Sequence, residues 1–301
     1  MGITVIGALI WYLFIKPHDY VVRFKTKASP GTVNQLIKFW IGKKEDAEFI
    51  AQNNLSDFSH RIRFNDSTFI YRWKVEPMND SISRVKVYVV DSTHSLSNRV
   101  TLPFSETDFE KRTKQTIRSA AKLLQEHLES FKVTVVGNDE IPSKYCACIP
   151  LKSIQIHKAA GMMEYYSFLS NFIAANKIEL DGRPMIEVEN WNMQNDSISY
   201  NFCFPILKKD SLPQRENLVY KQIQSQKVLR AIYNGNYITS DRAWYALLEY
   251  AEANKIPIEK KPLEIFHTNP NMGGNALEWE AEVFMPLNSE STNNHEKNKD
   301  I

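Results

Sequence analysis

Two carboxylates near the carboxyl end of the chain stand where they could bind a charged group. Glu280 and Glu282 alternate with apolar residues in the run that begins at Trp279 and continues through Val283 and Phe284. A carboxylate inside an apolar strand loses solvation, so we expect it to stay protonated to higher pH or to hold a positive partner. A cationic aromatic ligand would be such a partner, with roughly 0.5–2 kcal/mol of cation–π attraction from each aromatic wall. The alternative is that both glutamates line the solvent face of an amphipathic strand.

No cluster typical of catalysis or metal binding accompanies these glutamates. The seven histidines are scattered without metal-ligand spacing, and the sequence has neither a glycine-rich phosphate loop nor a G-x-S-x-G motif. We therefore expect no cofactor and no metal. The three cysteines, Cys146, Cys148 and Cys203, are predicted to be buried thiols; a redox pair of Cys146 and Cys148, which would share one face of a strand, is the alternative.

Composition is that of a folded protein with room for two domains. The chain has 301 residues, of which 43% are hydrophobic and 24% charged. Its 37 basic and 35 acidic side chains give a formal charge of +2, so no broad positive field is expected. Nothing resembles a helix-turn-helix, and the sequence predicts no nucleic-acid partner.

The amino terminus carries an uninterrupted apolar run, Ile3–Ile15. A membrane-spanning helix needs roughly 20 apolar residues, so three possibilities remain: an anchor whose upstream end is missing, a short interfacial anchor, or a buried element. We favour an anchor at residues 1–18. Basic residues follow the run, which by the positive-inside rule predicts that the globular part faces the cytoplasm; a soluble cytoplasmic protein is the alternative.

The first globular half, residues 19–137, reads as a sheet with one long helix. Alternating patterns predict strands at residues 19–29, 67–75, 82–90 and 98–104. Three- and four-residue spacings predict helices at 32–40 and 105–131, the second with a capping box at Ser105 and Asp108. This order resembles the helix-grip fold of the START-like, polyketide-cyclase-like (SRPBCC) superfamily, whose members bind hydrophobic ligands. Tyr71 and Trp73 would then line a cavity, or else simply fill the core.

The second half repeats itself. The segment 172–189 reads "FIAANKIELDGRPMIEVE", and 250–267 reads "YAEANKIPIEKKPLEIFH". Each copy follows a predicted strand and helix and precedes a polar turn and a strand that ends in proline plus an aliphatic residue. The sequence therefore predicts a duplicated β-α-β-β unit whose two copies form one antiparallel sheet.

This repeat closely resembles the GyrI-like effector-binding domain of bacterial transcription activators, over residues 143–287. The resemblance rests on three motifs: Gly235-x-Tyr237, Glu282-x-x-x-Pro286 and its partner Asn201-x-x-x-Pro205. In that family, ligands lie between the two halves against aromatic side chains and an acid of the final strand. The resemblance implies that Glu282 is this acid and Tyr237 the hydroxyl-bearing aromatic. Asn201 stands where many relatives have an acid.

Periodicity adds Trp279, Tyr200 and Trp244 as ligand-binding candidates. The predicted class is α+β: a helix-grip domain at 19–137, a GyrI-like domain at 138–288, and a disordered tail at 289–301. The predicted function is non-enzymatic binding or sensing of a small hydrophobic or cationic aromatic molecule. The alternative is a hydrolase of electrophilic small molecules, with Glu282 as general base and Tyr237 as orienting hydroxyl.

Overall fold

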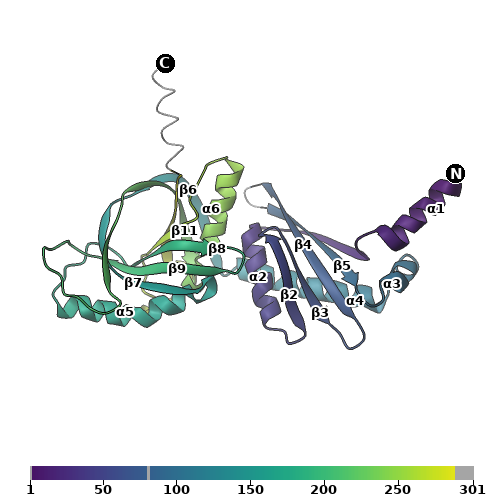
Figure 1. Cartoon of the computed structure of the whole chain (residues 1–301), viewed down its shortest axis with the longest axis horizontal. Helices are drawn as coiled ribbons and strands as arrows, with labels where there is room; N and C mark the ends of the chain where they lie inside the picture. The colour runs from purple at the N-terminus through teal and green to yellow at the C-terminus, as the bar shows by residue number, and fades with distance from the viewer. Residues whose placement is uncertain (1, 80–81, 289–301) are drawn as a thin grey trace, which may run out of the picture. The chain divides into compact units, whose positions relative to one another are not determined.

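The chain forms two compact units, Met1–Glu129 and Ser130–Ile301. The computed structural model describes residues 2–79 and 82–288 (Figure 1). The division falls after Glu129, so the predicted domain boundary at residue 137 lies inside a strand of the second unit. The predicted disordered tail lies outside the described residues.

Unit 1 contains a five-stranded antiparallel sheet in the order β1-β5-β4-β3-β2. Its strands are β1 (Tyr20–Thr26), β2 (Ala47–Asn54), β3 (Asp57–Arg63), β4 (Thr68–Asn79) and β5 (Ile82–Asp91). The predicted hairpin is confirmed, since β4 pairs with β5 and places Tyr71 opposite Val89. Neither β2 nor β3 was predicted, because their polar runs show weaker alternation.

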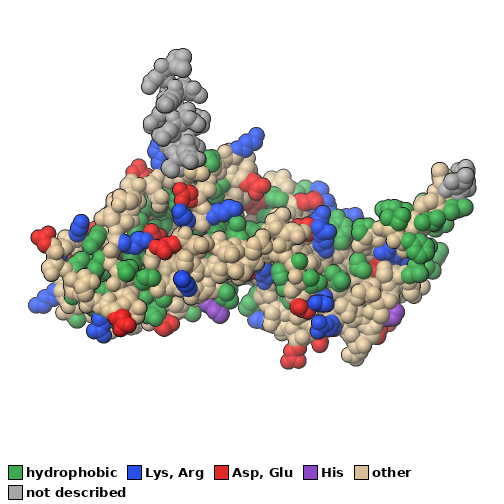
Figure 2. All heavy atoms as spheres, in the orientation of Figure 1, with side chains coloured by type: hydrophobic (Ala, Val, Ile, Leu, Met, Phe, Trp, Pro, Cys, Tyr) green, Lys and Arg blue, Asp and Glu red, His purple; other side chains and the backbone are tan. Residues whose placement is uncertain are grey.

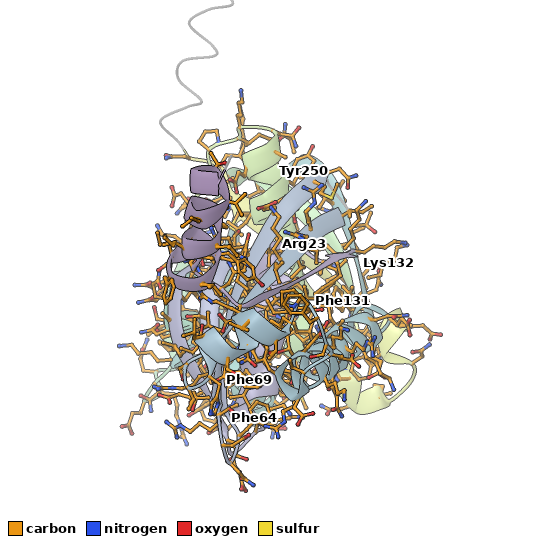
Figure 3. All side chains as sticks on the ribbon, turned by 90° about the vertical axis from the view of Figure 1, so that its right-hand side faces the viewer. Arg23, Phe64, Phe69, Phe131, Lys132 and Tyr250 are labelled. Carbon is orange, nitrogen blue, oxygen red and sulfur yellow. A yellow bond between two sulfur atoms is a disulfide. The ribbon has the colours of Figure 1, made fainter. Side chains whose placement is uncertain are left out.

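Beyond the amino-terminal run, the α-helices of unit 1 are α2 (Pro30–Gly42), α3 (Ser95–Thr101) and α4 (Asp108–Leu128). The Ser29 hydroxyl caps α2 by accepting from the Thr32 amide. In α4 the cap is Thr107, whose hydroxyl accepts from the Glu110 amide, two residues later than predicted. Buried residues of α4 and of the strands, such as Phe69 and Phe109, form one core; the Phe64 and Phe69 rings lie 4.6 Å apart (Figure 3).

The predicted strand at residues 98–104 is wrong, because this segment begins within α3. Its β-branched residues suggested a strand, but tertiary contacts of two polar residues hold it as a helix. The Asn98 amide donates to Asp91, and the buried Arg99 guanidinium lies 2.6 Å from the Asp19 carboxylate. Arg99 also donates to the backbone oxygens of Tyr12 and Leu13.

The amino-terminal run is helical, as α1 (Gly2–Ile10) and a π-helical turn, Trp11–Ile15. Several of its apolar side chains are about half exposed or more, including Leu9, Trp11 and Phe14. Within the described residues, no helix combines the length and the apolar character needed to cross a bilayer. The prediction of an anchor at residues 1–18 therefore finds no support in the secondary structure.

Unit 2 contains an eight-stranded antiparallel sheet in the order β10-β7-β9-β8-β12-β13-β11-β6. Its strands are β6 (Phe131–Ile141), β7 (Lys144–Ile154), β8 (Met185–Asn192), β9 (Ser197–Pro205), β10 (Val219–Ile223), β11 (Gln226–Gly235), β12 (Leu263–Phe266) and β13 (Glu280–Pro286). The series β7-β9-β8 on one side mirrors β11-β13-β12 on the other. The pseudo-twofold axis passes between β8 and β12, where Ile186 pairs with Glu264.

Helices α5 (Lys158–Ala175) and α6 (Arg242–Ala253) occupy equivalent places in the two halves, each after the first strand of its β-α-β-β unit. The repeated "ANK" encodes their ends. Lys177 and Lys255 have positive φ angles of 50° and 55°, and the amides of Ile178 and Ile256 return to carbonyls five residues earlier. The predicted duplication and the α+β class are confirmed.

One prediction about the cysteines is wrong. Cys148 forms a disulfide with Cys203, and Cys146 is the buried free thiol. Cys148 and Cys203 lie directly opposite each other on β7 and β9, with Cα atoms 4.1 Å apart. Cys146 and Cys148 are two residues apart along one extended strand, about 7 Å, which is too far for a bond without backbone movement.

Candidate functional site

Glu282 lies on the face of the sheet that the helices do not cover, while its neighbours Ala281 and Val283 are fully buried. Its two carboxylate oxygens have two basic partners. His267 Nε2 lies 2.7 Å from Oε2, and Arg230 Nε lies 3.2 Å from Oε1. The positive partner expected for this carboxylate is thus supplied from within the chain.

His267 also lines a small aromatic pocket between the two halves of unit 2. The cavity holds about 80 Å³. Its walls come from α5, from the segment directly before β8, and from the segments after β11 and around β12. The lining residues are Met162, Met163, Tyr166, Arg183, Pro184, Tyr237, Phe266, His267, Thr268, Asn269 and Pro270. We call it the aromatic pocket. Its lining combines apolar side chains with His267, which contacts the Glu282 carboxylate.

Tyr237 is positioned by the glycine of the G-x-Y motif. Gly235 has a φ of 154°, and a Cβ there would lie 2.8 Å from the Phe131 Cβ and 2.5 Å from the Tyr233 hydroxyl. The Tyr237 hydroxyl donates to the Glu280 carbonyl at 2.7 Å, and burial raises the pKa of Tyr237. The glycine therefore lets the backbone pass close to Phe131 and Tyr233, and the tyrosine two residues later lines the pocket.

The other predicted site residues separate into two groups. Trp279 lies beside Tyr237, with ring centroids 6.1 Å apart, and its indole N–H donates to the Gly273 carbonyl. Tyr200 and Trp244 instead are buried between helix and sheet: the Tyr200 hydroxyl donates to the Lys158 carbonyl, and Trp244 lies on α6. The structure brings the Tyr237 and Trp279 rings together and places the other two side chains in the core.

The sequence reasoning missed a buried ion pair beneath the helices. The Lys158 ammonium contacts the Glu264 carboxylate, with side chains 1% and 0% exposed. Glu264 also accepts from the Trp244 indole at 2.6 Å and from the Ser240 hydroxyl at 2.9 Å. The same signal that singled out Glu282, a carboxylate between apolar strand residues, was present at Glu264 between Leu263 and Ile265.

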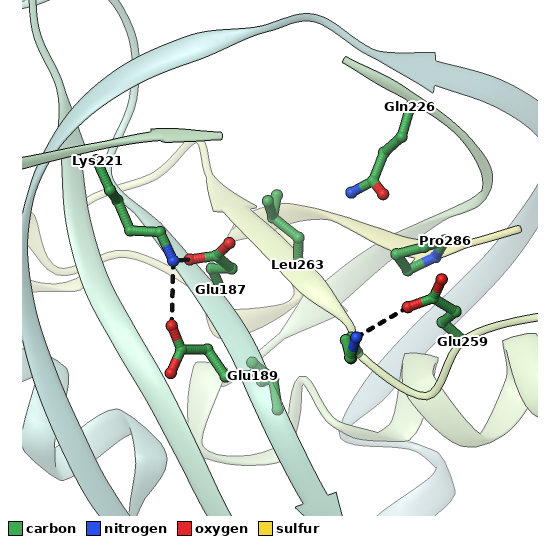
Figure 4. A pocket seen from close by; sticks show the side chains of 9 residues that line it. Glu187, Glu189, Lys221, Gln226, Glu259, Leu263 and Pro286 are labelled. Atoms are coloured by element: carbon green, nitrogen blue, oxygen red, sulfur yellow. Dashed lines mark hydrogen bonds and ion pairs between the residues drawn. The ribbon is translucent and has the colours of Figure 1, made fainter. Parts of the chain in front are cut away.

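A second, larger hollow lies on the helix-free face of unit 2 (Figure 4). Its volume is about 390 Å³, and its lining joins charged side chains to an apolar floor: Glu187, Val188, Glu189, Lys221, Gln226, Glu259, Lys261, Leu263 and Pro286. We call it the charged groove. Asn201, the counterpart of Glu282, donates its amide to Glu187 at 3.0 Å and to Glu189 at 2.8 Å.

Two further observations concern metal-ligand side chains and surface charge. Among residues 2–79 and 82–288, no three His, Cys, Asp or Glu side chains are grouped to hold a metal ion. Basic and acidic side chains are interspersed on the face of the molecule that Figure 2 shows, as expected for a formal charge of +2.

The chain is similar to several solved structures. No family model matches the chain, and no curated protein matches it. The EcmrR C-terminal domain has 15% identity and a TM-score of 0.43, over 52% of this chain and 98% of that one. A bacterial transcription regulation protein from Staphylococcus aureus MU50 has 13% identity and a TM-score of 0.35, over 53% and 98%. SAV2435, solved bound to tetraphenylphosphonium, has 12% identity and a TM-score of 0.37, over 55% and 98%.

Proposed function

We propose that unit 2 is a non-enzymatic, GyrI-like receptor for a small cationic aromatic molecule, which binds in the aromatic pocket. The observation that carries the proposal is His267, which lines the pocket and contacts the Glu282 carboxylate. His267 thus links the aromatic lining of the pocket to a carboxylate, whose other oxygen pairs with Arg230. Such a lining attracts cations through the ring quadrupole, and the attraction is larger when the cation is desolvated.

The size of the pocket limits what enters it. A volume of about 80 Å³ is smaller than the roughly 150 Å³ of a cavity that holds benzene, so side chains of the lining would have to move to admit one ring or one quaternary group. Met162 and Met163 are both lining residues, and flexible thioether side chains can repack around an inserted group. The contacts favour binding over hydrolysis, because the Tyr237 hydroxyl already holds the backbone of Glu280 and Thr268.

Isothermal titration of the full chain with tetraphenylphosphonium tests the proposal. Tetraphenylborate, which has nearly the same shape and the opposite charge, is the ligand control. We expect the cation to bind and the anion to bind at least about tenfold more weakly. Glu282→Gln should lower the affinity for the cation about tenfold, which corresponds to a loss of about 1.4 kcal/mol of binding free energy.

Glu164→Gln is the matched control variant, since Glu164 is an exposed glutamate of α5 next to Met163. It should bind as the parent does. Equal binding of both ions would show that charge plays no part, and unchanged binding by Glu282→Gln would remove the carboxylate from the site. Turnover of an electrophilic substrate that depends on Tyr237 would instead favour the hydrolase.

Unit 1 supports two narrower proposals. A START-like role in binding a polar-headed hydrophobic molecule is favoured by buried polar atoms without a protein partner, on the Asn34 side-chain amide and His60 Nε2. Lipid extraction and mass spectrometry of the purified chain would test it, and a chain free of lipid would count against it.

We also infer that the exposed apolar run at residues 4–15 contacts a lipid surface. Arg99 fixes the end of this run by donating to two of its carbonyls, so its apolar side chains are presented at a defined place on unit 1. Vesicle co-sedimentation should be lost in Leu9→Ser/Phe14→Ser. Met272→Ser, at an apolar residue of unit 2 that is 84% exposed, is the control.

A further inference from the structure

We propose that the charged groove on the helix-free face of unit 2 is a second binding site, separate from the aromatic pocket, and that it takes a short alkyl diamine or oligoamine. The groove differs from the aromatic pocket in size and lining. Its volume of about 390 Å³ lies within the range of small-molecule sites, and three carboxylates line it.

Two of these carboxylates are held in place before any ligand arrives. Glu187 and Glu189 lie two residues apart on β8, and the pairing of β8 with β9 shifts register between Val188 and Asn190. A bulge of this kind re-aims a side chain and is common near binding sites. Asn201, only 3% exposed, donates its amide N–H groups to both carboxylates. This buried amide keeps two like charges side by side.

Lys221 supplies the cation that this pair of carboxylates requires. Its ammonium lies 2.6 Å from Glu187 and 3.1 Å from Glu189. Burial alone would lower the pKa of Lys221, but the two carboxylates raise it, so the side chain is charged at neutral pH. Lys221 reaches the groove from β10, a five-residue strand at the edge of the sheet. A ligand ammonium can therefore take its place while the Lys221 side chain turns to solvent.

The apolar residues and Glu259 of the groove can bind the alkyl chain and the second ammonium of a diamine. Figure 4 shows Leu263 between the Glu187 side and the Glu259 side, and Pro286 beside Glu259. An alkyl chain would lie over this apolar floor. Glu259, whose partner Lys261 is 57% exposed, would accept the second ammonium. Three carboxylates against two lysines leave the groove with one excess negative charge, which favours a cationic occupant over an anionic one.

Isothermal titration of the full chain with 1,5-diaminopentane tests the proposal. 1-Aminopentane lacks the second ammonium, and 1,5-pentanediol lacks both. We expect the diamine to bind more tightly than the monoamine and the diol not to bind. Lys221→Met removes the ammonium that occupies the site. We expect the affinity for the diamine to rise about tenfold or more, because the ligand no longer competes with the Lys221 ammonium.

Lys144→Met is the matched control, since Lys144 is also a partly exposed lysine of a strand that pairs with a carboxylate, Asp181. It should leave diamine affinity unchanged. Glu187→Gln/Glu189→Gln should abolish diamine binding and leave tetraphenylphosphonium binding intact, which also shows that the variant is folded. The proposal is overturned by absence of diamine binding in both parent and Lys221→Met, by unchanged affinity in Lys221→Met, or by full affinity in the double variant.

Discussion

Removal of one partner of the Lys158–Glu264 pair should destabilise unit 2 far more than removal of both. In Lys158→Met the carboxylate of Glu264 stays in an environment that is 0% exposed and loses its cation. Breaking a buried ion pair from one side costs about 3–5 kcal/mol, whereas replacing both partners by neutral groups costs much less. The Trp244 ring, whose centroid lies 4.8 Å from the Lys158 ammonium, would also lose a cation–π contact.

Thermal unfolding followed by circular dichroism measures this effect. For a domain of 150–250 residues, 1 kcal/mol shifts Tm by about 2–4 °C, so we expect Lys158→Met to lower it by about 6–20 °C. Lys158→Met/Glu264→Gln should recover a large part of the loss. Lys261→Met is the control, because its pair with Glu259 is exposed and should contribute less than about 1 kcal/mol. A double variant as unstable as the sum of the single variants would refute the reasoning.

Three further predictions concern stability. Burial lowers the pKa of His60 from 6.5 to about 3, so the unfolded chain binds the proton first, and stability should fall by about 3 kcal/mol between pH 7 and pH 4. Urea titrations of the parent and His60→Phe should show this slope in the parent and a flatter one in the variant. Thiol counting on the denatured chain should find one free thiol before reduction and three after it, whereas three thiols before reduction would contradict the disulfide. Loss of the Cys148–Cys203 bond should lower the free energy of unfolding by about 4 kcal/mol. Gly235→Ala should destabilise by more than about 1 kcal/mol, whereas Gly42→Ala, with open space at its Cβ, should not.

The disulfide also bears on location. Structural disulfides persist in oxidising compartments and are rare in the cytosol. A disulfide confirmed by thiol counting would therefore count against the cytoplasmic location predicted from the basic residues that follow the amino-terminal run.

Sequence periodicity was enough to predict the duplicated half of the fold, because both copies encode the same local events. Each "ANK" ends a helix with a lysine at positive φ, and each strand before Pro205 or Pro286 closes its unit. Unit 1 was harder to predict. The segment at α3 was mistaken for a strand because what holds it is distant in sequence: the salt bridge from Arg99 to Asp19 spans eighty positions.

The candidate site was predictable only in part, for a related reason. Alternation identified Glu282 as a carboxylate in need of a partner, but nothing local indicated that His267 and Arg230 supply it. Tyr200 and Trp244 have the same aromatic character as Tyr237, and only the three-dimensional packing separates core residues from pocket residues. Alternation along one strand shows which face a side chain is on, but it does not show which residues of other strands will contact that side chain.

The pseudo-twofold axis relates one residue pair in each of the two proposed sites. Asn201 and Glu282 both stand four residues before the closing proline, and Glu189 and His267 both stand three residues after the paired residues at the axis. In one half an amide of the last strand donates to a carboxylate; in the other a carboxylate of the last strand meets an imidazole. The pairing of donor and acceptor is kept, but the residue types have exchanged places. The first half therefore presents two carboxylates to the charged groove, and the second presents a histidine to the aromatic pocket, so the two sites should select ligands of different classes.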